Sequence, residues 1–273
     1  MRLSTTSLET LAQAYPHQPV QFEFELDKPK LLQREHIAEL AEALPTQSIE
    51  QNMGNLTKVS EPSAARPTGL TAAESVRTIS DNGAWIVLKN IEQSEAYNKL
   101  VDSMIEQISA VTTPEARIQK RLQEGFIFVS SPGSVTPYHI DHEHNILFQI
   151  EGTKRVTIYP KKPPFLLPEE LERLHSGGHR NLPDREGIES GGEEFLLTPG
   201  TALYFPVTAP HWVQNGDQVS VSLSITWRSN LQKRERHHHL MNAWRRSQGK
   251  PVLEESANWQ RVTHTLLRKA RLR

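Results

Sequence analysis

Cysteine is absent from the 273-residue chain. Its absence excludes disulfides, thiolate metal sites and cysteine nucleophiles. A surplus of one charge is also lacking, because 31 basic and 32 acidic residues leave a formal net charge of −1. No global field therefore draws the protein to nucleic acid or to a membrane surface.

Long apolar runs are missing as well. No stretch approaches the roughly 20 apolar residues that a membrane-spanning helix requires, and residues 1–16 lack the apolar core of a signal peptide. The hydrophobic share of 36% and the charged share of 23% are those of a globular protein. We expect a soluble, cytoplasmic protein with no membrane partner.

The first 110 residues combine helical and strand patterns. Apolar–polar alternation predicts half-buried strands, apolar residues at helical spacing predict helices, and Pro and Gly mark loops. The elements expected on these grounds are a strand at Pro19–Leu26, a helix at Leu32–Leu44, a loop at Ser60–Gly69, a capped helix from Thr71, a strand at Trp85–Leu88 and a helix at Ser94–Ile108. We interpret residues 1–110 as an α/β flank packed on the rest of the chain.

From Phe126 onward the pattern is mainly β. Short runs rich in Val, Ile, Phe and Thr follow one another, with Gly and Pro turns between most of them. Many short strands of this kind indicate an antiparallel sandwich or barrel, whose core we assign to residues 111–230. The segment 161–194 interrupts the series, and its length suits a lid or a substrate loop.

A metal site is indicated by the sequence TPYHIDHEHN, which starts at Thr136. Residues two apart on a strand share a face, so His139 and Asp141 present an imidazole and a carboxylate side by side. These are two ligands of the 2-His-1-carboxylate triad of non-haem Fe(II) oxygenases, and His211 is the best-placed third. The alternatives are a chance pair on a surface strand and a ligand set that shifts to His142 or His144.

Lys154 provides a second indication of a ligand-binding site. In the run KRVTIY it shares a face with Val156 and Ile158. If those two residues face the barrel interior, the lysine points inward with them, and a buried ammonium requires an anionic partner. The alternative is a lysine at the start of a strand whose charged end reaches solvent.

The motifs around these residues resemble the core of Jumonji-C and cupin-like 2-oxoglutarate oxygenases, and are similar to the asparaginyl hydroxylase of the hypoxia response. That family has Thr-Pro-x-His-x-Asp, then Asn, then Gln-Ile-x-Gly-x-Lys. The matching residues are Thr136, His139, Asp141, Asn145, Gln149, Gly152 and Lys154. A second block, PGTALYFPVTAPH from Pro199 to His211, matches the family's Pro-Gly-Asp-x-Leu-Tyr-Ile-Pro and distal His, with Thr201 in place of the Asp.

The resemblance implies a double-stranded β-helix, or jelly-roll, and a role for each matching residue. His139, Asp141 and His211 would bind Fe(II). Residues expected around 2-oxoglutarate are Lys154 and Thr136 at its distal carboxylate, Asn145 near the metal, and Ser224 where the family often has Asn. The family's cosubstrate tyrosine has no counterpart, because Phe126 and Phe128 occupy the strand before the motif.

The resemblance therefore predicts an Fe(II)- and 2-oxoglutarate-dependent dioxygenase that hydroxylates a protein or peptide side chain. One alternative keeps this chemistry and changes the substrate to a small molecule or a tRNA base. Another is a cupin-like module without catalysis that binds a metal or ligand as a regulator.

The tail from Leu231 to Arg273 reads as two amphipathic helices with a break near Gly249. They would pack on the barrel or form a homodimer interface, and the related oxygenases favour the dimer. Three consecutive histidines, His237 to His239, point in different directions on a helix. We interpret them as a solvated polar face rather than a second metal site.

Overall fold

The computed structural model describes residues 1–27, 29–60, 66–254, 256, 258, 261–263 and 265–266. The strands are β1 (Val20–Glu23), β2 (Ile49–Met53), β3 (Ala84–Lys89), β4 (Ile118–Ser130), β5 (Val135–His139), β6 (His144–Glu151), β7 (Lys154–Ile158), β8 (Glu193–Leu197), β9 (Thr201–Phe205), β10 (His211–Asn215) and β11 (Ser220–Ser229). The helices are α1 (Thr5–Ala14), α2 (Arg34–Ala43), α3 (Ala72–Arg77), α4 (Glu95–Ser109), α5 (Pro168–His175) and α6 (Asn230–Ser247). Short 3₁₀ turns are η1 (Lys30–Leu32), η2 (Thr46–Ser48) and η4 (Ile91–Gln93).

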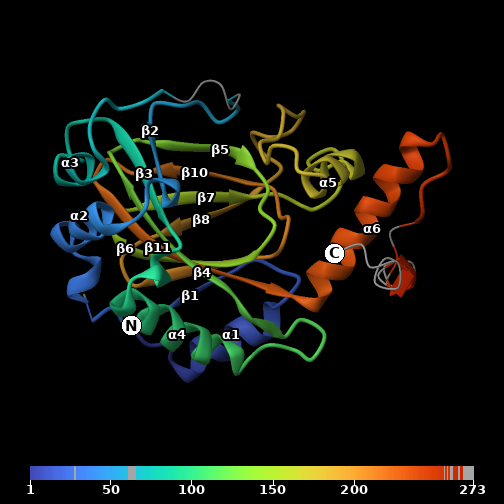
Figure 1. Cartoon of the computed structure of the whole chain (residues 1–273), viewed down its shortest axis with the longest axis horizontal. Helices are drawn as coiled ribbons and strands as arrows, with labels where there is room; N and C mark the ends of the chain where they lie inside the picture. Colours follow the sequence, from blue (N-terminus) through green and yellow to red (C-terminus); the bar gives the residue numbers. More distant parts are fainter. Residues whose placement is uncertain are drawn as a thin grey trace.

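Two antiparallel sheets form the body of the molecule. The larger has the strand order β1-β9-β6-β11-β4-β3-β2 and the smaller has β5-β10-β7-β8. Figure 1 shows the two sheets facing each other, and successive strands alternate between them from β4 to β7 and again from β8 to β11. This arrangement confirms the predicted mainly β, jelly-roll class with helical flanks.

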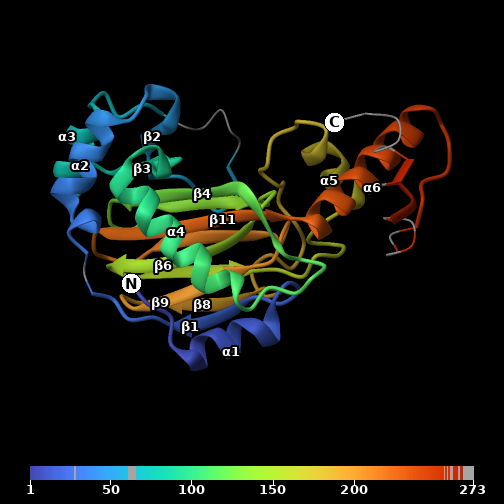
Figure 2. The same ribbon diagram turned by 60° about the horizontal axis from the view of Figure 1, so that its bottom comes forward.

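Strand β11 illustrates how the sequence sets the two faces of the large sheet. Its apolar residues Val221, Leu223, Ile225 and Trp227 alternate with small polar ones, and nearly every residue is buried. The apolar face joins a large cluster with the helices, and Figure 2 shows α4 crossing this outer face. The polar face therefore turns inward, between the sheets, where it provides hydrogen-bonding groups instead of core.

The interior between the sheets is apolar at one end. There Leu147, Leu203 and Phe205 of the large sheet meet Val156 and Val213 of the small sheet. Serine and threonine hydroxyls from β11 line the remaining space. The barrel is thus closed by packing on one side and left open to ligands on the other.

Most elements expected in the N-terminal flank are confirmed. The predicted strands correspond to β1 and β3, and the predicted helices to α2, α3 and α4. Thr71 and Glu74 form the expected capping box, each side chain accepting from the other's backbone N–H. The loop at Ser60–Gly69 falls partly outside the described residues, and α1, β2 and β8 were not predicted.

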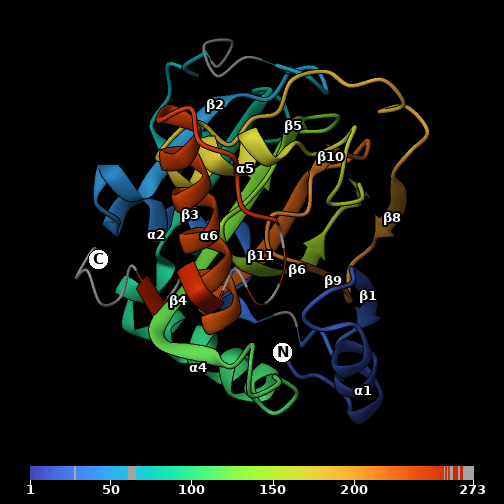
Figure 3. The ribbon, with the colours of Figure 1, turned by 90° about the vertical axis from the view of Figure 1, so that its right-hand side faces the viewer.

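The insertion 161–194 contains α5, which lies beside α6 at one end of the sheets (Figure 3). The Arg246 Nε donates to the Glu172 Oε2 at 3.0 Å, and the rings of His175 and His239 stack 5.4 Å apart. These contacts fix the insertion against the C-terminal helix.

The prediction that His237 to His239 form a solvated polar face is wrong. Their exposed fractions are 4%, 0% and 4%, because α5 covers one side of α6 and residues after Gly249 fold back on another. The Asn242 side chain holds the segment after Gly249 against α6. It accepts a hydrogen bond from the Leu253 N–H at 2.8 Å and donates one to the Leu253 carbonyl. Of the apolar tail residues, Val262 and Leu266 are exposed, whereas Leu267 and the basic end lie outside the described residues.

Buried histidines predict a fold that is sensitive to acid. Burial lowers the pKa of His144 and of His175 to about 3, and that of His239 to about 4. Because an unfolded histidine titrates near 6.5, the unfolded chain binds more protons once the pH falls below about 6.5. Each histidine then costs up to about 1.4 kcal/mol of unfolding free energy per pH unit, down to its folded pKa. We expect Tm to fall steeply between pH 6.5 and 4.

A variant of one buried histidine tests which groups are responsible. His175→Gln removes one buried imidazole and should flatten the decline relative to the wild type. Thermal unfolding followed by circular dichroism across this pH range gives both slopes. Identical slopes in the His175 variant and the wild type would contradict the assignment.

Candidate metal centre

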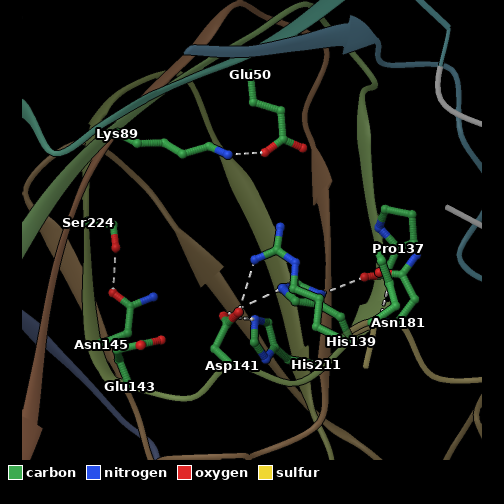
Figure 4. Close-up of polar contacts among 12 residues, drawn as sticks. Glu50, Lys89, Pro137, His139, Asp141, Glu143, Asn145, Asn181, His211 and Ser224 are labelled. Atoms are coloured by element: carbon green, nitrogen blue, oxygen red, sulfur yellow. Dashed lines mark hydrogen bonds and ion pairs between the residues drawn. The ribbon is translucent and has the colours of Figure 1, made fainter. Parts of the chain in front are cut away.

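The three predicted ligands meet at one end of the small sheet. His139 ends β5 and His211 begins β10, and the two residues are paired directly across these antiparallel strands. Asp141 lies two residues beyond the end of β5, yet its carboxylate still reaches the same point (Figure 4). The Asp141 Oδ2 is 3.6 Å from the Nε2 atom of each histidine.

The outer nitrogens of both imidazoles are held by backbone. The His139 Nδ1 donates to the Pro137 carbonyl at 2.6 Å, and the His211 Nδ1 to the Ala209 carbonyl at 2.9 Å. Such bonds fix the tautomer, leaving the Nε2 lone pairs free to face the carboxylate. Among the residues that the structure describes, these three form the only cluster of His, Asp or Glu close enough to share a metal ion.

The protonation states also suit metal binding. Burial lowers the pKa of His211 to about 3, so its imidazole is neutral. Burial raises the pKa of Asp141, but His139, Arg180 and His211 together outweigh that effect and hold it well below its usual value. A neutral imidazole and an ionised carboxylate are the forms that coordinate a metal.

His142 and His144 do not compete for the metal position. His144 is buried, with its Nδ1 2.8 Å from the Tyr204 hydroxyl and its Nε2 3.0 Å from that of Ser229. His142 borders the cavity, and its ring contacts His175 at 5.7 Å. Both imidazoles therefore lie in other contacts.

A cavity of about 630 Å³ opens beside the cluster. Thr136, Asn145 and Ser224 line it, and the Ser224 hydroxyl donates to the Asn145 Oδ1 at 2.7 Å. On the far side, the Lys89 Nζ and the Glu50 Oε2 form an ion pair at 2.6 Å (Figure 4). The cavity therefore brings together polar groups from both sheets around the histidines.

Lys154 points inward, as one of the two readings of its strand predicted. It is 4% exposed, and its ammonium lies 5.4 Å from the centre of the Phe128 ring, which also lines the cavity. Gly152 makes the tight turn into β7 with a φ of +67°, where a side chain would overlap the Val219 carbonyl.

The ammonium of Lys154 is buried without a counter-ion. Within the described part of the chain, no carboxylate pairs with it and no acceptor hydrogen-bonds to it. Burial lowers the pKa of this lysine to about 7. Its cross-strand neighbour Asn215 has a buried Oδ1 that likewise accepts nothing from any described residue. Two unsatisfied polar groups at this depth indicate a place for a polar ligand.

Arg180, a cavity residue that contacts the triad, was not predicted from the sequence. It lies in the 161–194 insertion, which was expected to be a lid or substrate loop without any residue being singled out. Its Nη1 donates to the Asp141 Oδ1 at 3.0 Å. The sequence around it, SGGHRN, has no periodicity that would place an arginine at a metal ligand.

A histidine–aspartate–histidine cluster inside a double-stranded β-helix defines a cupin-type metal centre. The chain belongs to the cupin-like domain family, whose model matches residues 2–233. The predicted Jumonji-C and cupin-like relationship is thereby confirmed. Among the described residues, no helix is long and apolar enough to cross a membrane.

Curated relatives share part of the chain. HSPB1-associated protein 1 from Homo sapiens is 30% identical over 112 residues, covering 37% of this chain and 23% of that protein. Lysine-specific demethylase 8 from Danio rerio is 28% identical over 102 residues, covering 35% and 25%. The match thus spans about a quarter of the length of these relatives.

Solved structures support the fold. The ribosomal oxygenase YcfD from Escherichia coli, in complex with cobalt and 2-oxoglutarate, superposes with a TM-score of 0.53 at 14% identity. The superposition covers 98% of this chain and 67% of that one. At this level of identity the likeness establishes a shared architecture.

Proposed function

We propose that this protein is an Fe(II)- and 2-oxoglutarate-dependent oxygenase. The observation that carries the proposal is the presence, in one barrel, of a 2-His-1-carboxylate cluster and a buried lysine with no described counter-ion. A metal alone would account for the cluster. It would leave the Lys154 ammonium unpaired, whereas an anionic cosubstrate pairs with it.

The donor set fits iron. Two imidazoles and one carboxylate on one side of a metal leave positions open, an arrangement suited to non-haem Fe(II). We assign metal binding to His139, Asp141 and His211. Their backbone and side-chain partners would hold the ligands in place before the metal arrives.

Lys154 and the polar residues that line the cavity fit the cosubstrate. Lys154 would pair with the distal carboxylate of 2-oxoglutarate, and the Thr136 hydroxyl would donate to the same group. Asn145 and its partner Ser224 would lie beside the end nearer the metal. When bound, iron and 2-oxoglutarate supply the oxidising chemistry, in which O₂ and the cosubstrate yield succinate, CO₂ and a hydroxylated substrate. The protein's own residues position these groups, supply charge and exclude water.

A protein or peptide side chain is the proposed substrate class. The related proteins named above include a ribosomal oxygenase and a lysine-specific demethylase. The cavity extends from the triad to the half-buried Lys89–Glu50 pair, which leaves room for an incoming side chain. Its aromatic wall, formed by Trp85 and Phe126, would contact the apolar stem of such a group.

An anaerobic titration tests the class directly. Apo protein receives Fe(II) and then 2-oxoglutarate, and we expect the weak visible charge-transfer band of a chelated cosubstrate. Admission of O₂ should then give slow, iron-dependent formation of succinate. Iron binding without the band would favour the regulator alternative, and the absence of any iron binding would overturn the proposal.

The homodimer expected from the tail is also a proposal. Four large apolar side chains of the C-terminal region are exposed among the described residues: Trp244 by 52%, Val252 by 44%, Val262 by 44% and Leu266 by 54%. A second copy of the chain would cover them. Sedimentation equilibrium distinguishes the dimer from a monomer.

A further inference from the structure

The inference concerns the end of the 161–194 insertion that runs beside β5. The Ile140 N–H donates to the Arg180 carbonyl at 3.1 Å, and the Leu182 N–H donates to the Tyr138 carbonyl at 2.9 Å. Between them Asn181 forms an antiparallel bridge with His139. The insertion is therefore hydrogen-bonded to the backbone segment that carries His139 and Asp141, two of the three residues of the metal cluster.

This register brings the Arg180 side chain to Asp141. Its Nη1 donates to the Oδ1 of that carboxylate at 3.0 Å, whereas the Oδ2 is the oxygen 3.6 Å from both histidine Nε2 atoms. The two oxygens thus have separate partners, a guanidinium outside and the metal position inside. A freely rotating carboxylate could present either oxygen, or both, to an ion.

We propose that Arg180 is a positioning residue for the metal: it holds the outer oxygen of Asp141, so that only the Oδ2 coordinates, and joins the insertion to the metal centre. The proposal rests on the metal-binding part of the proposed function.

Two effects of the guanidinium oppose each other. Its positive charge repels a metal cation, but its hydrogen bond fixes the orientation of the ligand. The side chain is 43% exposed, so solvent screens the repulsion. The hydrogen bond from Arg180 to Asp141 is short, directional and charge-assisted, so it remains strong despite the screening. Loss of such an outer partner typically weakens metal binding by about 10- to 100-fold.

The test measures Co(II) binding, with Co(II) standing in for Fe(II). Arg180→Met keeps much of the stem and removes the donor, and Arg180→Lys restores one donor. Arg155→Met is the matched control, because Arg155 is an exposed arginine that pairs with Glu194 on the outside of the small sheet. Calorimetry gives Kd, and the visible ligand-field spectrum reports the coordination number.

We expect Kd to rise by roughly 10- to 100-fold in Arg180→Met and by less in Arg180→Lys, with Arg155→Met equal to wild type. The Co(II) band of Arg180→Met should weaken, as a carboxylate coordinating through both oxygens raises the coordination number. Wild-type affinity with an unchanged spectrum, tighter binding in Arg180→Met, or an equal loss in the Arg155 control would each overturn the proposal. Failure of the wild type to bind Co(II) would instead count against the proposed function.

Discussion

Replacement of His211 with alanine is expected to abolish measurable Fe(II) binding. The substitution removes one of three donors whose ligand atoms lie within 4.8 Å of one another. Losing a ligand should cost more than the roughly 10- to 100-fold that loss of an outer hydrogen-bond partner costs. Equilibrium dialysis under anaerobic conditions gives the stoichiometry, which should fall from one iron per chain to zero.

The fold should survive this change. His211 packs against Phe205, with ring centroids 4.8 Å apart, so alanine leaves a small void. Its Nε2 faces the metal position, so no protein hydrogen bond is lost there. In the wild type, metal at 100 times Kd should add about 2.7 kcal/mol of stability, and this gain should vanish in the variant.

A histidine elsewhere provides the control. His17 is exposed, and His17→Ala should keep both the iron stoichiometry and the metal-dependent rise in Tm. The same loss is expected for His139→Ala, since its Nε2 is equally far from the Asp141 Oδ2. Unchanged stoichiometry in the His211 variant would remove that residue from the ligand set.

The clustering of the triad could be predicted because it depends on short-range rules. His139 and Asp141 stand two apart, and the second sequence block placed His211 on a later strand. The structure pairs that strand with β5 so that the histidines lie directly opposite each other. The inward direction of Lys154 followed from strand parity, since Val156 and Ile158 on its face are buried.

The missed features depend on contacts between distant segments. Strand β2 is half-buried throughout and lacks apolar alternation, so only its pairing with β3 defines it. The three histidines of α6 read as a polar face because local spacing says nothing about α5, which covers them. The contact of Arg180 with Asp141 likewise depends on how the insertion pairs with β5, and the two residues are 39 positions apart in the sequence.

Replacement of Lys154 with methionine should have opposite effects on cosubstrate binding and on stability. Truncation of one partner of a buried ion pair costs about 2–5 kcal/mol, which is roughly a 30- to 5,000-fold loss of 2-oxoglutarate affinity. Without cosubstrate the ammonium has no described counter-ion, so an apolar side chain of similar length should leave Tm unchanged or raise it. Iron binding should be retained, because Lys154 is outside the triad.

A suitable control is Lys89→Met, which changes a lysine that lines the cavity and is already paired with Glu50. It should leave 2-oxoglutarate affinity within a few-fold of wild type. Calorimetric titration with 2-oxoglutarate in the presence of Mn(II) measures both variants. If Lys154→Met bound the cosubstrate as tightly as the wild type, the distal carboxylate would have to lie elsewhere in the barrel.

The pH dependence of the wild type gives an independent readout of the same ammonium. Because burial lowers the pKa of Lys154 to about 7, the charge is largely present below pH 7 and is progressively lost above it. Binding of a dianion then has to take up a proton, so affinity for 2-oxoglutarate should fall by up to about tenfold per pH unit above 7. In Lys154→Met this slope should disappear. A fall with the same slope in the variant would assign the titration to another group, whereas its loss would tie cosubstrate binding to the charge on this one lysine.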